Sequence, residues 1–281
     1  MKKPTVVMQS DFGIDSGLVA CMHGMCRLVD PELETQDITH LIPAFDIEAA
    51  SYCLQYTVPF WPSGTIFVSV VDPGVGTSRK ASVAKLKNGS YVVTPDNGTL
   101  TYLKKRIGVE EIREIDEEIN RYPLTRDVHT FHGRDLFAYC AARLAAGVIS
   151  FEEVGPAYPI SDIVCHELKC AKISDGFVET EIKSYDPFGS AELTVENQEF
   201  QKAGFQIGDK VRTLVLDGEE VVFDMVIPYE KSFGYVEKGE DVIFNDLASY
   251  VTIASNEAYF QEKYQLDPEK TYCVHLIKES K

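Results

Sequence analysis

The chain has 281 residues, of which 44% are hydrophobic and 25% are charged, and these values exclude a generally disordered protein. Its 27 Lys and Arg residues face 44 Asp and Glu residues, and the formal net charge of -17 disfavours nucleic acid or an anionic membrane as a partner. No apolar run approaches the ~20 residues needed to cross a bilayer, and the N-terminal segment lacks the apolar stretch of a signal peptide. We therefore expect a soluble, cytoplasmic protein.

Short apolar strands alternate with helices through the first half of the chain. Continuous β-branched and aromatic runs predict buried strands, and apolar residues at helical spacing predict amphipathic helices. The expected strands are 5–9, 65–71 and 90–94, and the expected helices are 17–29, 47–56 and 136–146. This alternation favours a mainly parallel α/β sheet.

The pattern changes near residue 155, where short strands separated by turn signals replace the alternation. Dipeptides such as Asp175-Gly176 and Asp217-Gly218 recur at the spacing of a small all-β barrel or sandwich. We therefore expect an N-terminal α/β domain over 1–157, a linker over 158–171 and a smaller C-terminal β domain over 172–281.

The seven cysteines do not predict a disulfide framework or a structural zinc site. None lies in a Cys-x-x-Cys pair, and the count is odd in a chain that shows no export signal. We expect reduced thiols, most of them packed as small apolar side chains.

Four glycine-containing loops follow strands in the first half and carry most of the candidate chemistry. Ligands of open α/β sheets bind beyond the carboxyl ends of the strands, so these are candidate site loops, although each one alone is also an ordinary turn. They are Ser10-Asp11-Phe12-Gly13, Asp72-Pro73-Gly74-Val75-Gly76, Pro95-Asp96-Asn97-Gly98 and Thr130-Phe131-His132-Gly133-Arg134-Asp135.

Other common site motifs do not occur in the sequence. Phosphate-loop, dinucleotide-binding and nucleophile-elbow patterns are missing. His129 and His132 with Asp127 and Asp135 do not predict a metal site either, because side chains three apart in an extended loop point in different directions.

Taken in this order, the four loops and Arg79 resemble one family, the S-adenosyl-L-methionine (SAM) hydroxide adenosyltransferases, which are related to the SAM-dependent fluorinase and chlorinase. The resemblance covers the chain from residue 5 to the end of the expected α/β domain. It implies an α/β domain followed by a smaller β domain, and a homotrimer that holds its ligand at the subunit interface. It also implies SAM as the substrate, with no cofactor and no metal.

The reaction implied by the resemblance is hydrolysis of SAM to adenosine and L-methionine, through attack of water or hydroxide at the ribose C5′. The sulfonium is a good leaving group, so the protein has to hold water in line in a dry pocket. Asp72, Arg79 and His132 match the family's water-activating set, in which Arg79 stabilises the carboxylate and either Asp72 or His132 takes the proton. A carboxylate at this position repels a halide, which favours water over halogenation.

Five further residues are expected to bind the substrate. Asp11 matches the family's ribose-binding carboxylate, with capping of the next helix as the alternative. Asn97 and Phe45 are expected at the nucleoside, although a core position is an equal alternative for Phe45. Phe188 and Ser190 belong to a C-terminal loop that reads Asp-Pro-Phe-Gly-Ser, whereas the family usually carries Asn after this Phe-Gly pair.

The departures from the family pattern concern the substrate more than the reaction. Ser190, and Ser16 where the family has Asp, fall on the adenine and amino-acid side of the site. Two alternatives to SAM hydrolysis follow: an enzyme of the same scaffold that cleaves another 5′-substituted adenosine, and a non-catalytic SAM- or adenosine-binding sensor. Retention of Asp72, Arg79 and His132 argues against the sensor.

Overall fold

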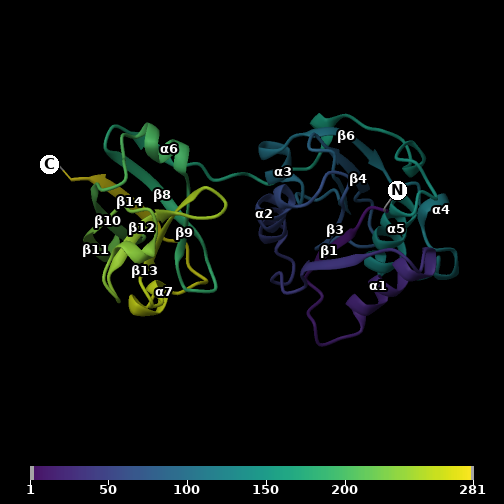
Figure 1. The fold of residues 1–281 in the computed structure, drawn as a ribbon, viewed down its shortest axis with the longest axis horizontal. Coiled ribbons are helices and arrows are strands. Elements are labelled where there is room, and N and C mark those ends of the chain that lie inside the picture. Colours follow the sequence, from purple (N-terminus) through teal and green to yellow (C-terminus); the bar gives the residue numbers. More distant parts are fainter. Residues whose placement is uncertain (1–2, 280–281) are drawn as a thin grey trace. The chain divides into compact units, whose positions relative to one another are not determined.

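The computed structural model describes residues 3–279, which form two units, each with a hydrophobic core of its own. One unit ends at Glu167 and the other begins at Leu168 (Figure 1). This division falls inside the stretch 158–171 that the sequence predicts as a linker; the domain limits of 157 and 172 stay predictions. The expected fold class is confirmed, because an α/β unit precedes an all-β unit.

A six-stranded sheet forms the centre of the first unit. In spatial order its strands are β2 (Thr35–Thr39), β1 (Val6–Ser10), β3 (Ile66–Val70), β5 (Tyr91–Pro95), β4 (Ala81–Leu86) and β6 (Val109–Glu114). β2, β1, β3 and β5 are parallel, and β4 runs antiparallel to both of its neighbours. Every residue of β1 and β3 is buried, including the polar Gln9, Ser10 and Ser69, and apolar residues do not alternate with exposed ones in either strand.

Helices cover both faces of this sheet (Figure 1). Val6 and Met8 of β1 pack in one core with Met22 and Cys140, whereas Val7 packs in another with Leu54. The first core therefore belongs to α1 (Leu18–Val29) and α5 (Tyr139–Ala145), and the second to α2 (Ile47–Thr57) and α3 (Thr101–Arg106). The shorter helices are η1 (Val58–Phe60), α4 (Glu117–Asn120), η2 (Pro123–Thr125), the π-helix η3 (Gly133–Ala138), η4 (Glu152–Val154) and η5 (Ile160–Asp162).

Most elements expected from the sequence are confirmed to within one residue at each end. The exception is the helix expected over 136–146, which begins as the π-helix η3 at Gly133 and continues as α5 to Ala145. β2, β4, β6 and α3 are not among the expected elements. In β2 the reason is visible, because this edge strand is polar and half-exposed and so lacks a buried apolar run.

The second unit is an antiparallel sheet that curls into a nearly closed barrel, as expected. Its path runs β11 (Glu220–Pro228), β10 (Lys210–Asp217), β14 (Cys273–Lys278), β8 (Phe177–Tyr185), β9 (Ala191–Glu196), β13 (Tyr250–Ser255) and β12 (Asp241–Asn245), with β7 (Lys172–Ser174) beside β8. The path closes after β11, where the Glu230 N–H donates to the Ile243 carbonyl of β12 at 2.8 Å. The helices of this unit are α6 (Asn197–Lys202), η6 (Phe233–Tyr235) and α7 (Phe260–Lys263).

The expectation that most cysteines are packed is wrong, because Cys21, Cys165 and Cys170 are exposed and Cys273 is half-buried. All seven are free, and Cys26, Cys53 and Cys140 are buried. Burial raises the pKa of Cys26 and Cys140 to about 12, so these two thiols stay protonated and unreactive. Among residues 3–279 no helix is long and apolar enough to span a membrane, and the cytoplasmic location stays a prediction.

Candidate active site

The candidate catalytic loops lie at one edge of the parallel sheet. β1 and β3 are parallel neighbours; Asp11 directly follows β1, and Asp72 comes two residues after the end of β3. Both carboxylates therefore lie beyond the carboxyl ends of adjacent strands, where open α/β sheets bind ligands. His132 reaches the same cavity from the loop that precedes η3.

The structure brings Asp72, Arg79 and His132 into direct contact. Arg79 Nε lies 3.0 Å from both carboxylate oxygens of Asp72, and Arg79 Nη2 donates to Asp72 Oδ2 at 2.5 Å. The same Nη2 donates to His132 Nδ1 at 2.9 Å. The side chains of Arg79 and Asp72 are only 10% and 5% exposed, so their charges attract each other with little screening by water.

The contact with Arg79 fixes the protonation of His132. A guanidinium can only donate, so Nδ1 of His132 must accept, and the neutral ring carries its proton on Nε2. Burial, followed by the positive charge of Arg79, lowers the pKa of His132 below its usual 6.5 and keeps the ring neutral at pH 7. Its Nε2 is buried and has no hydrogen-bond partner among residues 3–279. An oxygen of substrate or water is therefore the expected acceptor.

A cavity of about 320 Å³ opens beside this set, and Asp11, Phe45, Asp72 and His132 all line it. Asp11 Oδ2 accepts from the Phe45 N–H at 3.0 Å, and Phe45 adopts a left-handed φ of 68°. Phe45 is 71% exposed, which excludes a core position. The other lining residues are Phe12, Leu18, Ala44, Val70, Val75, Thr130, Phe131 and Gly133.

Asp11 does not cap the following helix. α1 begins after Gly17, which serves as its N-cap, and the Ser16 hydroxyl accepts from the Leu18 N–H at 3.4 Å. The carboxylate of Asp11 instead holds the loop that carries Phe45. Its Oδ1 makes no hydrogen bond with the described residues.

Glycine at position 133 lets the His132 loop pass close to the Asp11 loop. A Cβ on Gly133 would lie 2.9 Å from two ring carbons of Phe12, and Phe12 packs edge to face on Phe131 with ring centroids 5.7 Å apart. The π-helix that starts here buries Asp135, which pairs with Arg134 through contacts of 2.6 and 2.9 Å. π-Helical turns are often found at functional sites because they redirect side chains next to them.

Asn97 lies outside the residues that line this cavity. Its Nδ2 donates to the Val71 carbonyl at 2.8 Å, and its Oδ1 accepts from the Thr99 hydroxyl at 2.9 Å. The amide therefore holds the backbone immediately before Asp72. Both carboxylate oxygens of the neighbouring Asp96 also accept hydrogen bonds within the protein, from the Tyr158 hydroxyl and from the Val164 N–H, each at 3.0 Å. A direct contact of Asn97 with the nucleoside stays a prediction.

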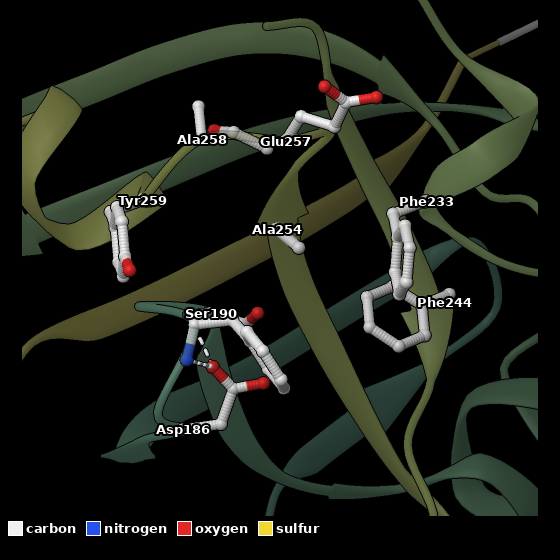
Figure 2. A pocket seen from close by; sticks show the side chains of 10 residues that line it. Asp186, Ser190, Phe233, Phe244, Ala254, Glu257, Ala258 and Tyr259 are labelled. Carbon is white, nitrogen blue, oxygen red and sulfur yellow. Dashed lines mark hydrogen bonds between the residues drawn. The ribbon is translucent and has the colours of Figure 1, made fainter. Parts of the chain in front are cut away.

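Phe188 and Ser190 line a separate cavity of about 360 Å³ in the second unit. Asp186 shapes this wall, because its Oδ1 accepts from the backbone N–H groups of Phe188 at 2.8 Å and Ser190 at 2.9 Å (Figure 2). Figure 2 shows Phe233 and Phe244 on one side of the cavity and Tyr259 on the opposite side. This largely apolar lining suits a flat ring.

Sequence reasoning did not identify these three aromatic residues. Phe233 comes from η6, Phe244 from β12 and Tyr259 from the turn before α7, and no motif marks any of them. The pairing of β12 with β13 and the closure of the barrel bring them together. In the first unit Phe12 and Phe131 were also missed, although both lie inside the predicted site loops.

Comparison with known proteins agrees with this two-unit architecture. A model of the SAM hydroxide adenosyltransferase N-terminal domain matches residues 6–155, and a model of the C-terminal domain of the same family matches residues 180–273. The crystal structure of an uncharacterized conserved protein from Thermotoga maritima superposes with a TM-score of 0.87 at 32% identity, covering 97% of this chain and 100% of that one.

Two curated relatives carry different activities in their names. The chain is 33% identical to an (R)-S-adenosyl-L-methionine hydrolase of Salinispora tropica, over 90% of each chain, and 27% identical to a fluorinase of Nocardia brasiliensis, over 94% of each chain. The class of protein is thus an enzyme in which an α/β domain precedes a β-barrel domain. The chain belongs to the SAM hydroxide adenosyltransferase family.

Proposed function

We propose that the protein hydrolyses SAM to adenosine and L-methionine, with water attacking the ribose C5′. The observation that carries this proposal is the buried Asp72–Arg79–His132 set at the wall of a cavity that also contains Asp11. Hydrolase relatives at 33% and 30% identity over at least 90% of this chain support it. Asp72 also supports water rather than a halide as nucleophile, because a carboxylate repels an anion nearby.

The geometry favours Asp72 as the group that takes the proton. His132 Nδ1 accepts from Arg79 and His132 Nε2 already holds a proton, so the neutral ring can donate to water but cannot accept from it. The carboxylate of Asp72 can accept about four hydrogen bonds. Arg79 stabilises its negative charge without occupying all of these positions, so Asp72 can still accept from water. Water would accept from His132 and donate to Asp72.

The step then balances without a further reactant. The water oxygen forms a bond to C5′, the C5′–S bond breaks, and its electron pair neutralises the sulfonium to the thioether of methionine. The water proton passes to Asp72 and from there to solvent. Positioning the water supplies most of the rate, because the sulfonium leaves without help from an acid.

The remaining expected residues complete the proposal. Asp11 would accept hydrogen bonds from the ribose hydroxyls, and the exposed ring of Phe45 would cover the nucleoside. Phe188 and Ser190 would contact another part of the ligand from a β-barrel cavity, within a homotrimer. Asn97 would act by holding the segment that carries Asp72. No cofactor or metal takes part in the proposed reaction.

A second candidate is cleavage of a different 5′-substituted adenosine. The favouring observation is Ser190, which is 5% exposed and whose backbone N–H is held by Asp186, in a loop where the family usually offers an Asn side chain. A serine hydroxyl donates and accepts at one oxygen on a shorter side chain, whereas an amide presents its donor and acceptor on two separate atoms.

The deciding experiment is product analysis after incubation of the protein with SAM in ¹⁸O-labelled water. We expect labelled adenosine and methionine from the unchanged protein. Asp72→Asn should lower the rate by about 10²–10⁴-fold, the range for loss of a general base. Asp162→Asn serves as matched control, because Asp162 is an exposed carboxylate of the same unit outside the cavity, and should keep the rate.

The other outcomes discriminate between the alternatives. SAM binding in calorimetry without product would replace hydrolysis by a sensor function. The second candidate would be established if the protein neither binds nor cleaves SAM but turns over another 5′-substituted adenosine.

A further inference from the structure

A second cluster of polar side chains lies at the edge strand of the α/β sheet. His23 of α1, Asp37 of β2 and His40, which follows β2, place one nitrogen or oxygen atom each within 4.8 Å of the others. His23 Nε2 is 3.0 Å from Asp37 Oδ1 and 3.1 Å from Oδ2, and His40 Nε2 is 3.0 Å from Oδ1. None of the three lines the cavity that contains Asp72.

A β-bulge explains why Asp37 and His40 face the same way. In a regular strand, residues three apart point to opposite faces. Here Met8 of β1 pairs with Asp37 and the next residue, Gln9, pairs with Thr39, so Ile38 is an extra residue in β2. Because of this extra residue, the side chains of Asp37 and His40 lie on the same side of the strand and face His23 of α1.

The second nitrogen of each ring is held by a hydroxyl group. His23 Nδ1 lies 2.8 Å from Thr35 Oγ1, and His40 Nδ1 lies 2.7 Å from Ser10 Oγ. Histidine ligands of metal ions almost always have the non-ligating ring nitrogen fixed by such a partner, which sets the tautomer and aims the other nitrogen. Both Nε2 atoms are thereby aimed at the carboxylate of Asp37.

The hydrogen bonds of this cluster depend on the ring tautomers, because each hydroxyl can accept from Nδ1 or donate to it. If each Nδ1–H donates to its hydroxyl, both Nε2 atoms present lone pairs to a carboxylate, and this arrangement repels unless a cation lies between the groups. The buried Nε2 of His40 has no hydrogen-bond partner among residues 3–279, although Asp37 Oδ1 is only 3.0 Å away, because the oxygen lies off the ring N–H direction.

The spacing of these atoms is one that a bound metal ion also produces. Ligand atoms ~2.1 Å from one ion, at angles between a right angle and a tetrahedral one, lie roughly 3.0–3.4 Å apart. The His–Asp distances of 3.0 and 3.1 Å fall at this value. His23 and Asp37 are 28% and 40% exposed, so an ion can enter and these side chains can adjust, while the 3% exposed His40 stays fixed.

We propose that His23, Asp37 and His40 bind one divalent transition-metal ion of the kind that prefers two imidazoles and a carboxylate, such as Zn²⁺ or Co²⁺. The ion would have a structural effect on the first unit. Ser10, which holds His40, also accepts from the Phe12 N–H at 3.2 Å, and the Gly13 N–H donates to the His40 carbonyl at 2.8 Å. Metal binding would therefore tighten the loop that carries Asp11.

The test uses tag-free, chelator-treated full-length protein titrated with Zn²⁺ by calorimetry and with Co²⁺ by visible absorption. We expect one ion per chain, ligand-field bands of Co²⁺, and a Zn²⁺-dependent rise in Tm of about 5 °C at saturation. His23→Gln should weaken Zn²⁺ binding at least ~10-fold and abolish the rise in Tm. Asp37→Asn is a second variant at a part-exposed position, in case the first fails to fold.

His275→Gln is the matched control. His275 is 29% exposed and faces a single carboxylate, with Nε2 3.8 Å from Glu179 in the second unit, so its loss should leave Zn²⁺ binding unchanged. An unchanged protein that binds neither ion would overturn the proposal. Equal Zn²⁺ affinity in His23→Gln and the unchanged protein would also overturn it, because the ion would then lie elsewhere.

Discussion

The hydrogen bond from Arg79 to His132 can form only when the His132 ring is neutral. Protonated Nδ1 cannot accept from Arg79, and an imidazolium beside the guanidinium would add repulsion to the lost bond. Burial and the charge of Arg79 accordingly lower the pKa of His132 below 6.5. We therefore expect the Arg79–His132 contact to be present at neutral pH and to be lost on acidification.

The activity should follow this titration. We expect kcat/KM for SAM hydrolysis to be flat near neutral pH and to fall on the acid side with an apparent pKa below 6.5, because only neutral His132 keeps its bond to Arg79. His132→Asn should lower the rate and remove the acid limb, since an amide does not titrate. An acid limb that persists unchanged in His132→Asn would assign it to another group.

The same titration has a consequence for stability, with a defined sign. The pKa is lowered on folding, so between the folded value and 6.5 the unfolded chain binds more protons than the folded one. This contribution to stability is fully present above pH 6.5 and is lost as the pH falls through the folded pKa. Denaturant titrations of the unchanged protein and His132→Asn across this range should converge at low pH; parallel curves would contradict it.

Arg79 acts through the shape of its guanidinium as well as its charge. Nε and Nη2 contact both oxygens of Asp72, and Nη2 also reaches His132. Lysine offers a point charge without the planar fork, so Arg79→Lys should keep the ion pair but lose the alignment of Asp72 with His132. We expect kcat to fall by about 10²-fold with SAM binding nearly kept, measured by steady-state kinetics and calorimetry. A kcat close to that of the unchanged protein would show that charge alone suffices.

The π-helix η3 sets the position of His132 through a close contact at its first residue. Gly133→Ala would place a Cβ 2.9 Å from the ring of Phe12, and relief of this clash displaces that ring from Phe131 or moves one of the two loops. We expect a loss of about 1–3 kcal/mol in the free energy of unfolding and a marked drop in turnover. Gly24→Ala is the matched control: its Cβ would meet nothing within 4 Å on helix α1, so it should stabilise by about 1 kcal/mol and spare turnover. Equal effects of the two substitutions would contradict a steric role for position 133.

Some elements of the fold can be predicted from the sequence, and others cannot. β1 and β3 are short, mostly apolar segments, so these strands could be predicted, whereas the pairing of Asp72 with Arg79 was implied by the family resemblance. The π-helical start at Gly133 could not be predicted, because π- and α-helical turns bury the same apolar residues here. The Asp37–His40 cluster could not be predicted, because β2 is not an expected strand and only the bulge at Ile38 turns these two residues to one side.

The two units have separate hydrophobic cores, which determines whether each unit can fold without the other. The apolar core of the barrel draws its fully buried residues from 178–276, whereas those of the α/β unit come from residues up to 163. Each unit can therefore bury its apolar surface without the other. A domain of this size, with a nearly closed sheet, has enough core to fold independently.

We therefore expect the fragment 168–281 to fold alone. It should unfold in one cooperative transition with a Tm within about 5 °C of a transition seen in the full chain, because the burial and the closure between Glu230 and Ile243 lie entirely within it. The fragment should not hydrolyse SAM, since Asp72, Arg79 and His132 belong to the other unit. Circular dichroism, calorimetry and product analysis test both statements. A broad, non-cooperative transition would mean that the barrel requires the α/β unit, and turnover by the fragment would remove the catalytic set from the mechanism.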